Sequence, residues 1–179
     1  LKVARVNGKI TVSYTEISGI FRAALILKAM GGEDFEVEEK RAAKELCLMI
    51  DCSRNAVKNA ETVKKLIRII AAAGYTSLML YTEDTFEVDN EPMFGYLRGK
   101  YTKAEMKELD AYAADLGIEL IPCIQTLAHF NQLKRYQYSH FKCFDCSDIL
   151  LAGETRTYEL IENIFKTLRE CYKTEKIHI

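Results

Sequence analysis

The chain has 179 residues, which is enough for one sizeable hydrophobic core or for one domain with part of another. Its formal net charge is −1, so its electrostatics favour neither a nucleic acid nor an anionic membrane as a partner. Its apolar runs are far too short to span a bilayer, which argues against a membrane-spanning segment.

The first residues predict a β-hairpin followed by a helix. Asn7-Gly8 lies between two alternating runs in "VARVNGKITVSY", which is the strongest short hairpin signal. The segment "TEISGIFRAALILKAM" then has helical spacing and ends at Gly31-Gly32. Its predicted inward face is formed by Ile17, Ile20, Phe21, Ala24 and Leu27.

The acidic stretch "GGEDFEVEEKRAAK" is predicted to be a connector. Two strands and one helix cannot enclose a core of their own. We therefore expect residues 1–44 to be the C-terminal part of a small α+β domain together with a connector.

From residue 45 onward, strands and helices alternate. Strands are predicted at 45–51, 76–82, 118–124 and 176–179, where the last is the "KIHI" that ends the sequence. Helices are predicted between them, at 57–73, 101–117 and 155–172. Gly74 is expected to end the first helix, and Thr102 with Glu105 to form a capping box on the second.

Repeated right-handed crossovers of this kind imply a parallel sheet, either an open doubly wound sheet or a (β/α)8 barrel. No glycine-rich phosphate-binding motif follows any strand, which disfavours the open sheet. Polar residues instead follow the C-terminal ends of the strands, where barrel enzymes have their sites. We therefore predict an α/β fold in which residues 45–179 form about the first four strands of a TIM-type barrel.

Three consecutive strand ends carry chemically unusual residues. Each has an ordinary alternative, such as a helix cap, a surface cation or a solvated loop charge. Their convergence at one end of a sheet nevertheless favours a pocket. The residues are Asp51 and Arg54 after the first strand, Tyr81, Glu83 and Asp84 after the second, and Gln125, His129 and Asn131 after the third.

The chemistry of this set suits a sugar. Arg54 offers a fixed fork of donors that can hold two neighbouring hydroxyls. An acid beside a histidine orients and charges the imidazole, while Tyr81 offers an aromatic wall or a hydroxyl. Glu83 and Asp84 are sequence neighbours that point to opposite faces of an extended chain, so they are not expected to form an acid and nucleophile pair.

Six dispersed cysteines indicate a reducing compartment, for which we expect the cytoplasm. Cys143 and Cys146 have a suggestive spacing, but a zinc site needs two further ligands at matching spacing, and the sequence offers no such pair. A redox motif would normally open a helix after a strand, whereas this one lies in a loop-like segment. We therefore predict ordinary thiols and no metal.

Several ordered motifs resemble glycoside hydrolase family 20, the β-N-acetylhexosaminidases. That family has D-x-x-R after its first barrel strand, matched by Asp51 and Arg54, and a "TDD"-like motif after its second, matched by Thr82-Glu83-Asp84. The segment "RGKYTKAEMKELDAYAADLGIELIPCIQTLAH" resembles a family segment whose histidine falls on His129. The segment "GKITVSYTEISGIFRAALILKA" resembles the end of the small domain that precedes the barrel.

The resemblance implies a glycan or glycoconjugate with a terminal N-acetylhexosamine as substrate and no cofactor. Arg54, Asp51 and Asp84 would bind substrate, while Glu83 and His129 would form a catalytic supporting pair. Hydrolysis in the family is retaining and substrate-assisted: the 2-acetamido oxygen attacks the anomeric carbon, an aspartate orients it, and the adjacent glutamate protonates the leaving group. This differs from the usual scheme of two carboxylates.

The sequence departs from the family pattern. The family's "PEID-PGH" is here "PCIQTLAH", and Glu83 replaces an aspartate, which leaves open whether Glu83 or Asp84 faces His129. The family's catalytic Asp-Glu pair follows the fourth strand, whereas this sequence ends at "HI", so we expect an inactive fragment whose general acid lies beyond residue 179. Unpaired edges of a half barrel predict self-association.

Two alternatives come from other classes of protein. A noncatalytic sugar-binding or assembly module would bind N-acetylglucosamine through Arg54 without hydrolysing it. An unrelated barrel enzyme, such as a metal-dependent hydrolase, is disfavoured because the first strand lacks an H-x-H-like ligand pair.

Overall fold

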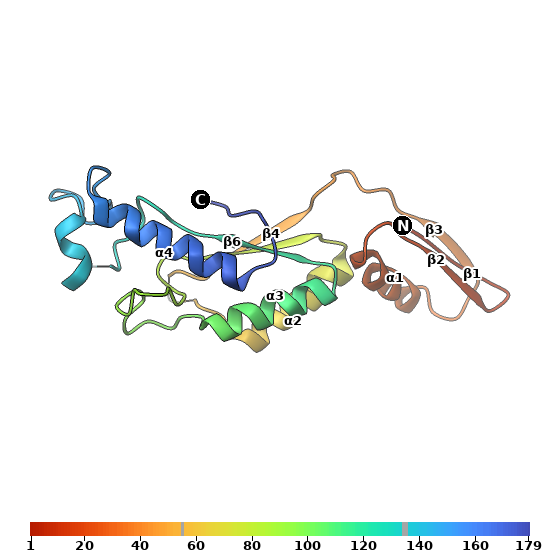
Figure 1. The fold of residues 1–179 in the computed structure, drawn as a ribbon. Coiled ribbons are helices and arrows are strands. Elements are labelled where there is room, and N and C mark those ends of the chain that lie inside the picture. Colours follow the sequence, from red (N-terminus) through yellow and green to blue (C-terminus); the bar gives the residue numbers. More distant parts are fainter. Residues whose placement is uncertain (55, 134–135) are drawn as a thin grey trace.

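Two β-sheets follow one another along an elongated molecule in the computed structural model, which describes residues 1–54, 56–133 and 136–179 (Figure 1). The first sheet is antiparallel with the order β2-β1-β3, and the second is parallel with the order β4-β5-β6. Among the described residues, no helix has the length and apolar content needed to cross a membrane.

The predicted hairpin is confirmed. Strand β1 (Lys2–Val6) pairs antiparallel with β2 (Lys9–Ser13). The turn between them has positive φ at both central residues, 50° at Asn7 and 76° at Gly8. Asparagine and glycine tolerate this left-handed backbone better than other residues, which explains why these two residues form the turn.

The prediction of a plain connector after the first helix is wrong in one part. Strand β3 (Phe35–Glu38) lies within that stretch and pairs antiparallel with β1. Apolar Phe35 and Val37 alternate with glutamates, and the half-buried apolar side chains pack on a small separate core. That core consists of buried Val3, Ala23 and Ile26. The third strand therefore gives the N-terminal unit a core of its own.

The predicted inward face of the first helix is right only in part: Phe21 and Leu27 are half-buried and pack against the cores, whereas the other three residues are exposed. Helix α1 (Ser18–Ala29) leaves Ile20 42% exposed, and Ile17 just before the helix is 54% exposed. Apolar residues occur all around this helix, so helical spacing alone does not select the buried face. Small residues allow close approach to neighbouring segments, and the buried positions are Ser18, Gly19, Ala23 and Ile26.

The parallel sheet has three strands and a fourth, partial partner. Strands β4 (Cys47–Asp51), β5 (Ser77–Tyr81) and β6 (Glu119–Cys123) pair in parallel as predicted. The expected fourth strand at 176–179 is instead a single bridge, in which His178 pairs with the last residue of β6. Two backbone hydrogen bonds of 2.9 Å flank that bridge, and they do not extend into a ladder.

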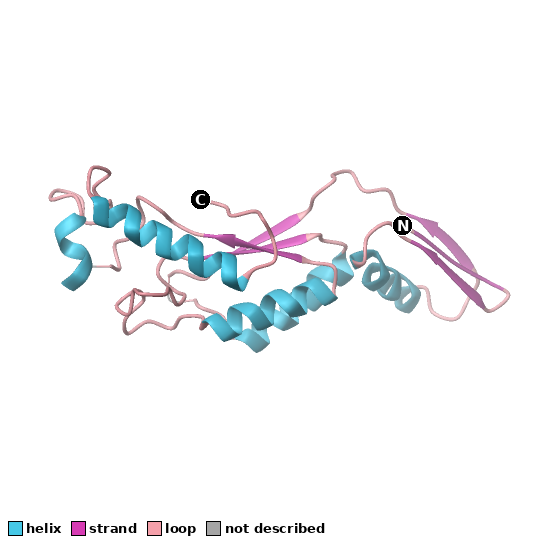
Figure 2. Cartoon of the chain, in the orientation of Figure 1, coloured by secondary structure: helices cyan, strands magenta, loops and turns pink. Residues whose placement is uncertain are grey.

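Three helices follow the strands: α2 (Ala60–Ala73), α3 (Lys103–Asp115) and α4 (Thr155–Cys171). Figure 2 shows α2 and α3 running along the parallel strands. The main core forms where these helices meet the sheet, and it includes Leu78, Leu80 and Leu120 from the strands and Ile67 and Leu109 from the helices. Among the described residues, no helix lies on the opposite face of the sheet, where Met49 of β4 is 57% exposed.

Helix boundaries follow local capping. The capping box of Thr102 and Glu105 is present, and Gly74 adopts the left-handed backbone (φ 87°) that ends α2. Helix α2 begins three residues later than the predicted position 57, because the Asn59 side chain accepts a hydrogen bond from the Thr62 N–H at 2.9 Å.

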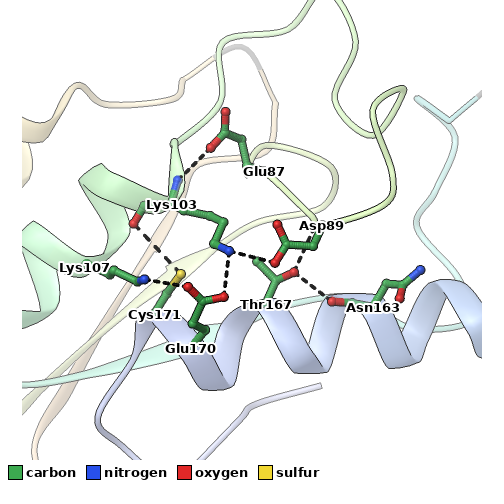
Figure 3. Close-up of polar contacts among 8 residues, drawn as sticks. All are labelled: Glu87, Asp89, Lys103, Lys107, Asn163, Thr167, Glu170 and Cys171. Atoms are coloured by element: carbon green, nitrogen blue, oxygen red, sulfur yellow. Dashed lines mark hydrogen bonds and ion pairs between the residues drawn. The ribbon is translucent and has the colours of Figure 1, made fainter.

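A polar cluster joins α3 to α4 and to the loop after β5 (Figure 3). The Lys103 ammonium lies 2.7 Å from both Asp89 and Glu170, and Lys107 lies 2.7 Å from the second oxygen of Glu170. The Thr167 hydroxyl accepts the Asp89 N–H at 3.0 Å. The long loop between β5 and α3 is thus fastened to α4 at its middle.

Candidate functional site

The carboxyl ends of the three parallel strands lie side by side. Asp51 pairs in register with Tyr81, and Tyr81 pairs with Cys123, so the last residues of β4, β5 and β6 form one row. The polar residues singled out in the sequence follow these three positions. The structure therefore brings the loops that carry Arg54 and Glu83 to one edge of the sheet.

Glu83 and Arg54 form the centre of the candidate site. Glu83 Oε1 lies 3.5 Å from Arg54 Nη2, and the Tyr81 hydroxyl donates a hydrogen bond of 3.4 Å to the same oxygen. Burial raises the pKa of the Glu83 carboxyl, and the positive charge of Arg54 opposes that rise. The site thus combines a buried acid with a guanidinium that faces solvent.

Asp51 shapes the turn that leads to Arg54. Its Oδ1 accepts hydrogen bonds from the Ser53 N–H at 2.8 Å and the Ser53 hydroxyl at 2.7 Å. These two bonds lower the pKa of Asp51, and the charge of Arg54 contributes in the same direction. The helix-cap alternative for Asp51 is wrong, because Asn59 caps α2.

Asp84, which was expected to bind substrate, is buried in the loop just after β5. Its side chain is only 3% exposed, and its Oδ1 lies 3.1 Å from Arg98 Nε. Burial raises the pKa of Asp84, and Arg98 opposes the rise. Arg98 also donates a hydrogen bond to the Ser53 carbonyl, so the Asp84–Arg98 pair braces the loops after β4 and β5. Asp84 Oδ1 is buried and has no hydrogen-bond partner among the described residues, and the binding of substrate by Asp84 stays a prediction.

His129 lies in the loop after β6 with a left-handed backbone (φ 61°). Its Nδ1 is 3.9 Å from Asp148 Oδ2, and Asp148 Oδ1 accepts the Asn131 N–H at 2.9 Å. The imidazole is half-exposed, and it lowers the pKa of Glu83 only through its charge. A direct Glu83–His129 pair stays a prediction.

Sequence reasoning missed Glu91, a buried glutamate in the loop between β5 and α3. Its side chain is 1% exposed and accepts hydrogen bonds from the Tyr138 hydroxyl at 3.0 Å, Arg156 Nη2 at 2.6 Å and Asn163 Nδ2 at 3.0 Å. Tyr138 belongs to the 3-10 helix η1 (Tyr136–Phe141), and the other two partners belong to α4. Glu91 thus fixes the far part of the loop that begins with Glu83.

In the described part of the chain, no three histidine, cysteine, aspartate or glutamate side chains gather as metal ligands. Cys143 and Cys146 are free, half-buried thiols. The site at the strand ends is therefore assembled from an acid, a guanidinium, a phenol and a nearby imidazole. These groups can donate and accept hydrogen bonds around a polyhydroxylated ligand.

A parallel α/β sheet with such groups at its carboxyl edge is typical of barrel-type hydrolases. The family model described as "Glycosyl hydrolase family 20, catalytic domain" matches residues 47–179, and the chain belongs to this family. The resemblance recognised in the sequence is thereby confirmed.

Individual relatives agree with this assignment. A beta-hexosaminidase of Akkermansia muciniphila is 26% identical, in a match covering 74% of this chain and 32% of that protein. The solved structure of a mutant Streptomyces plicatus beta-hexosaminidase in complex with GlcNAc matches 99% of this chain and 43% of its own, at 20% identity and a TM-score of 0.85.

The beta-N-acetylhexosaminidase from Bacteroides fragilis matches 99% of this chain and 41% of its own, at 20% identity and a TM-score of 0.82. These likenesses confirm the α/β fold. The chain spans about a third of the length of the curated relative and less than half of these two solved structures.

Proposed function

We propose that this chain is the sugar-holding part of a β-N-acetylhexosaminidase, an enzyme that removes terminal β-linked N-acetylglucosamine or N-acetylgalactosamine with retention of configuration. The main observation that supports this proposal is the pair of an exposed Arg54 guanidinium and a buried Glu83. The pair lies at the carboxyl ends of parallel strands in a chain of family 20. The substrate class is a glycan or glycoconjugate that ends in an N-acetylhexosamine.

Arg54 is the residue that meets the sugar. Its Nη2 lies 3.5 Å from Glu83, and two-thirds of its side chain faces solvent. The remaining donors of the planar guanidinium can bind two neighbouring hydroxyls at once. Because the partner acid is buried and braced by Tyr81, the orientation of the fork is set before the sugar arrives.

Glu83 and His129 act as positioning residues in this proposal. In the substrate-assisted reaction the acetamido oxygen attacks the anomeric carbon, and a glutamate gives its proton to the leaving group. Glu83 orients and charges His129, which in turn supports that glutamate. The charge interaction between Glu83 and His129 supports this order of contacts.

The general acid is a third carboxyl group, different from Glu83 and Asp84. Glu83 is engaged with Arg54, and Asp84 is buried against Arg98, so neither is placed to protonate a leaving group. We propose that the 179 residues alone bind the sugar without hydrolysing it.

An assay with an aryl β-N-acetylglucosaminide tests this proposal. The 179-residue chain should bind N-acetylglucosamine and release no aryl alcohol, while a longer protein that continues past residue 179 should release it. Turnover by the 179-residue chain at the rate of the longer protein would contradict the proposed division of roles.

A noncatalytic sugar-binding or assembly module is the second candidate. It is favoured by Cys123, which stands where the family pattern has a glutamate, and by the position of His129 beside Asp148. The same assay on the longer protein distinguishes the two candidate functions. A module would bind N-acetylglucosamine through Arg54 and leave the aryl glycoside intact.

A further inference from the structure

The peptide unit that joins Ser53 to Arg54 is held by a side chain from another loop. Arg98, in the loop between β5 and α3, donates a hydrogen bond from Nη2 to the Ser53 carbonyl. We propose that Arg98 is a positioning residue for sugar binding: it holds this peptide unit and so sets the direction in which the Arg54 side chain leaves the backbone. The inference rests on the proposed function, in which Arg54 binds the sugar.

Hydrogen bonds hold the whole turn from the end of β4 to Arg54. A peptide unit is planar, so a hydrogen bond at its N–H or its carbonyl restricts the orientation of the entire unit. The earlier bonds of the turn run from the Cys52 N–H to the Tyr81 carbonyl at 2.8 Å, from the Thr85 hydroxyl to the Cys52 carbonyl at 2.8 Å, and from the Ser53 N–H to Asp51 Oδ1 at 2.8 Å. The bond from Arg98 holds the last unit before Arg54.

Arg98 is itself placed by the chain. Its side chain is only 17% exposed, and its Nε lies 3.1 Å from Oδ1 of Asp84, which is buried. The Arg98 N–H donates a hydrogen bond of 3.1 Å to the Gly95 carbonyl, so the residue closes a tight turn. Because the guanidinium is planar, with its donors at fixed angles, an Nε that faces Asp84 also determines where Nη2 points. The contact with Asp84 therefore directs Nη2 to the Ser53 carbonyl.

The residues that make these contacts lie in the interior of the described chain. Strand β5, which leads into the loop of Arg98, is the central strand of its sheet, with β4 and β6 on either side. Ser53 is fully buried, and Asp84 is 2% exposed. Additional chain could only add to this burial, so the inference applies equally to a longer protein that includes this sheet.

Arg98 acts through Arg54 and not on the sugar itself. Its Nε faces Asp84 and its Nη2 faces the Ser53 carbonyl, whereas two-thirds of the Arg54 side chain is exposed. A guanidinium binds two neighbouring hydroxyls only when its plane is correctly directed. Without the bond from Arg98, Arg54 should sample more orientations before the sugar arrives, and the cost of ordering them lowers the affinity.

A double-mutant cycle on the binding of N-acetylglucosamine tests this role. Arg98→Lys keeps a positive charge beside Asp84 but loses the planar fork that also reaches Ser53. It should raise the Kd about fivefold, which lies in the range measured for coupled residues. Arg54→Lys has no fork to direct, so adding Arg98→Lys to it should raise the Kd no further. NMR titration of the wild type and the three variants measures each Kd.

Two further variants separate positioning from general stability. Arg22→Lys makes the same substitution in the N-terminal unit, where the guanidinium contacts Glu39 at 2.6 and 2.9 Å, and it should leave the Kd unchanged. Thr85→Val removes the hydroxyl that bonds the Cys52 carbonyl and keeps a branched side chain, so it should raise the Kd about twofold. If Arg98→Lys does not fold, an unchanged Kd in Thr85→Val overturns the proposal.

Amide hydrogen exchange of the sugar-free chain gives a readout that needs no ligand. The Ser53 N–H is bonded to Asp51 Oδ1 within the turn. This amide should exchange several-fold faster in Arg98→Lys than in the wild type, because the turn opens locally without the bond from Arg98. The Met106 amide of α3, bonded to the Thr102 carbonyl at 2.9 Å, should exchange at the same rate in both. A general loss of stability would instead speed exchange at both amides.

Two results would overturn the proposal. One is an equal Kd for Arg98→Lys and the wild type. The other is a Kd of the double variant about fivefold above that of Arg54→Lys, because Arg98 would then act independently of Arg54. Failure of the proposed function looks different: Arg54→Lys would bind the sugar as tightly as the wild type. Faster exchange at Ser53 would then mean that Arg98 holds the turn but has no role in binding this sugar.

Discussion

Glu83 and Arg54 lie 3.5 Å apart in opposite environments, with the Glu83 side chain 7% exposed and that of Arg54 66% exposed. Such a pair contributes little to stability, since one partner is desolvated and the other remains hydrated. The pair instead fixes the orientation of the guanidinium: the buried acid contacts one edge of it, and the other donors face solvent. The relationship is suited to binding a ligand at the strand ends.

Replacement of Glu83 by glutamine should flatten the pH dependence of stability. Burial raises the folded pKa of Glu83 above its usual value of 4.5, so the folded chain holds this proton more tightly than the unfolded chain. Its contribution to the free energy of unfolding therefore falls as pH rises from 4.5 through the folded pKa. Urea unfolding of both proteins across this range measures the effect.

Asp84 and Asp110 also have pKa values raised by burial, but both are present in the wild type and in Glu83→Gln. The difference between the two curves therefore reports Glu83 together with its charge interaction with Asp84. Parallel curves would show that Glu83 is not desolvated as the structure places it.

Replacement of Glu91 by alanine should destabilise the fold by about 3 kcal/mol, because it leaves the buried end of Arg156 without its acid. Glu162→Ala on α4 is the matched control, since its ion pair with Lys166 is exposed and should contribute less than about 1 kcal/mol. Urea unfolding compares the two. If both variants lost the same free energy of unfolding, Glu91 would not stabilise the loop.

Replacement of Gly95 by alanine should disturb the position of Asp84. Gly95 has φ 64°, and an added Cβ would collide with the Asp84 carbonyl oxygen. Gly31→Ala is the control, because Gly31 has φ 65° with no atom within 4 Å. The control should cost about 1–2 kcal/mol for left-handed backbone alone, and Gly95→Ala a further 1–3 kcal/mol or so for overpacking. Similar unfolding midpoints would argue against this close contact.

Self-association is expected through the sheet. Strand β4 lies at the edge of the parallel sheet, and its exposed Met49 adds apolar surface on the helix-free face. An unpaired edge of this kind invites pairing with another copy. Sedimentation velocity of the 179-residue chain at micromolar concentration should show dimers or larger species. A compact monomer would count against this expectation.

Local signals in the sequence predicted much of the fold. The Asn7-Gly8 turn and the Thr102–Glu105 capping box each act over a few residues, so their structural result can be read directly from the chain. The short strand β3 was missed because glutamate is uncommon in strands, and the acidic composition concealed the alternation.

The candidate site was predictable in its location and less so in its contacts. Residues that follow parallel strands must converge, which placed Arg54 and Glu83 together. The partners of Glu91 are 47, 65 and 72 residues away along the chain, so no local sequence pattern predicts these contacts. Likewise, only packing reveals that Asp84 is buried against Arg98.

Titration with N-acetylglucosamine tests the central claim most directly. At about −0.3 kcal/mol per non-hydrogen atom, this sugar should bind with a Kd on the order of 1 mM. NMR spectra should show the largest shifts at Arg54 and its neighbours after β4 and β5. Arg54→Lys, which loses the planar fork, should weaken binding about tenfold.

Arg68→Lys makes the same substitution on α2, where the guanidinium contacts the Tyr112 hydroxyl at 2.6 Å, and should leave the Kd unchanged. The account predicts this contrast between the two arginine variants. An Arg54→Lys chain that binds N-acetylglucosamine as tightly as the wild type, or shifts confined to residues away from the strand ends, would contradict it.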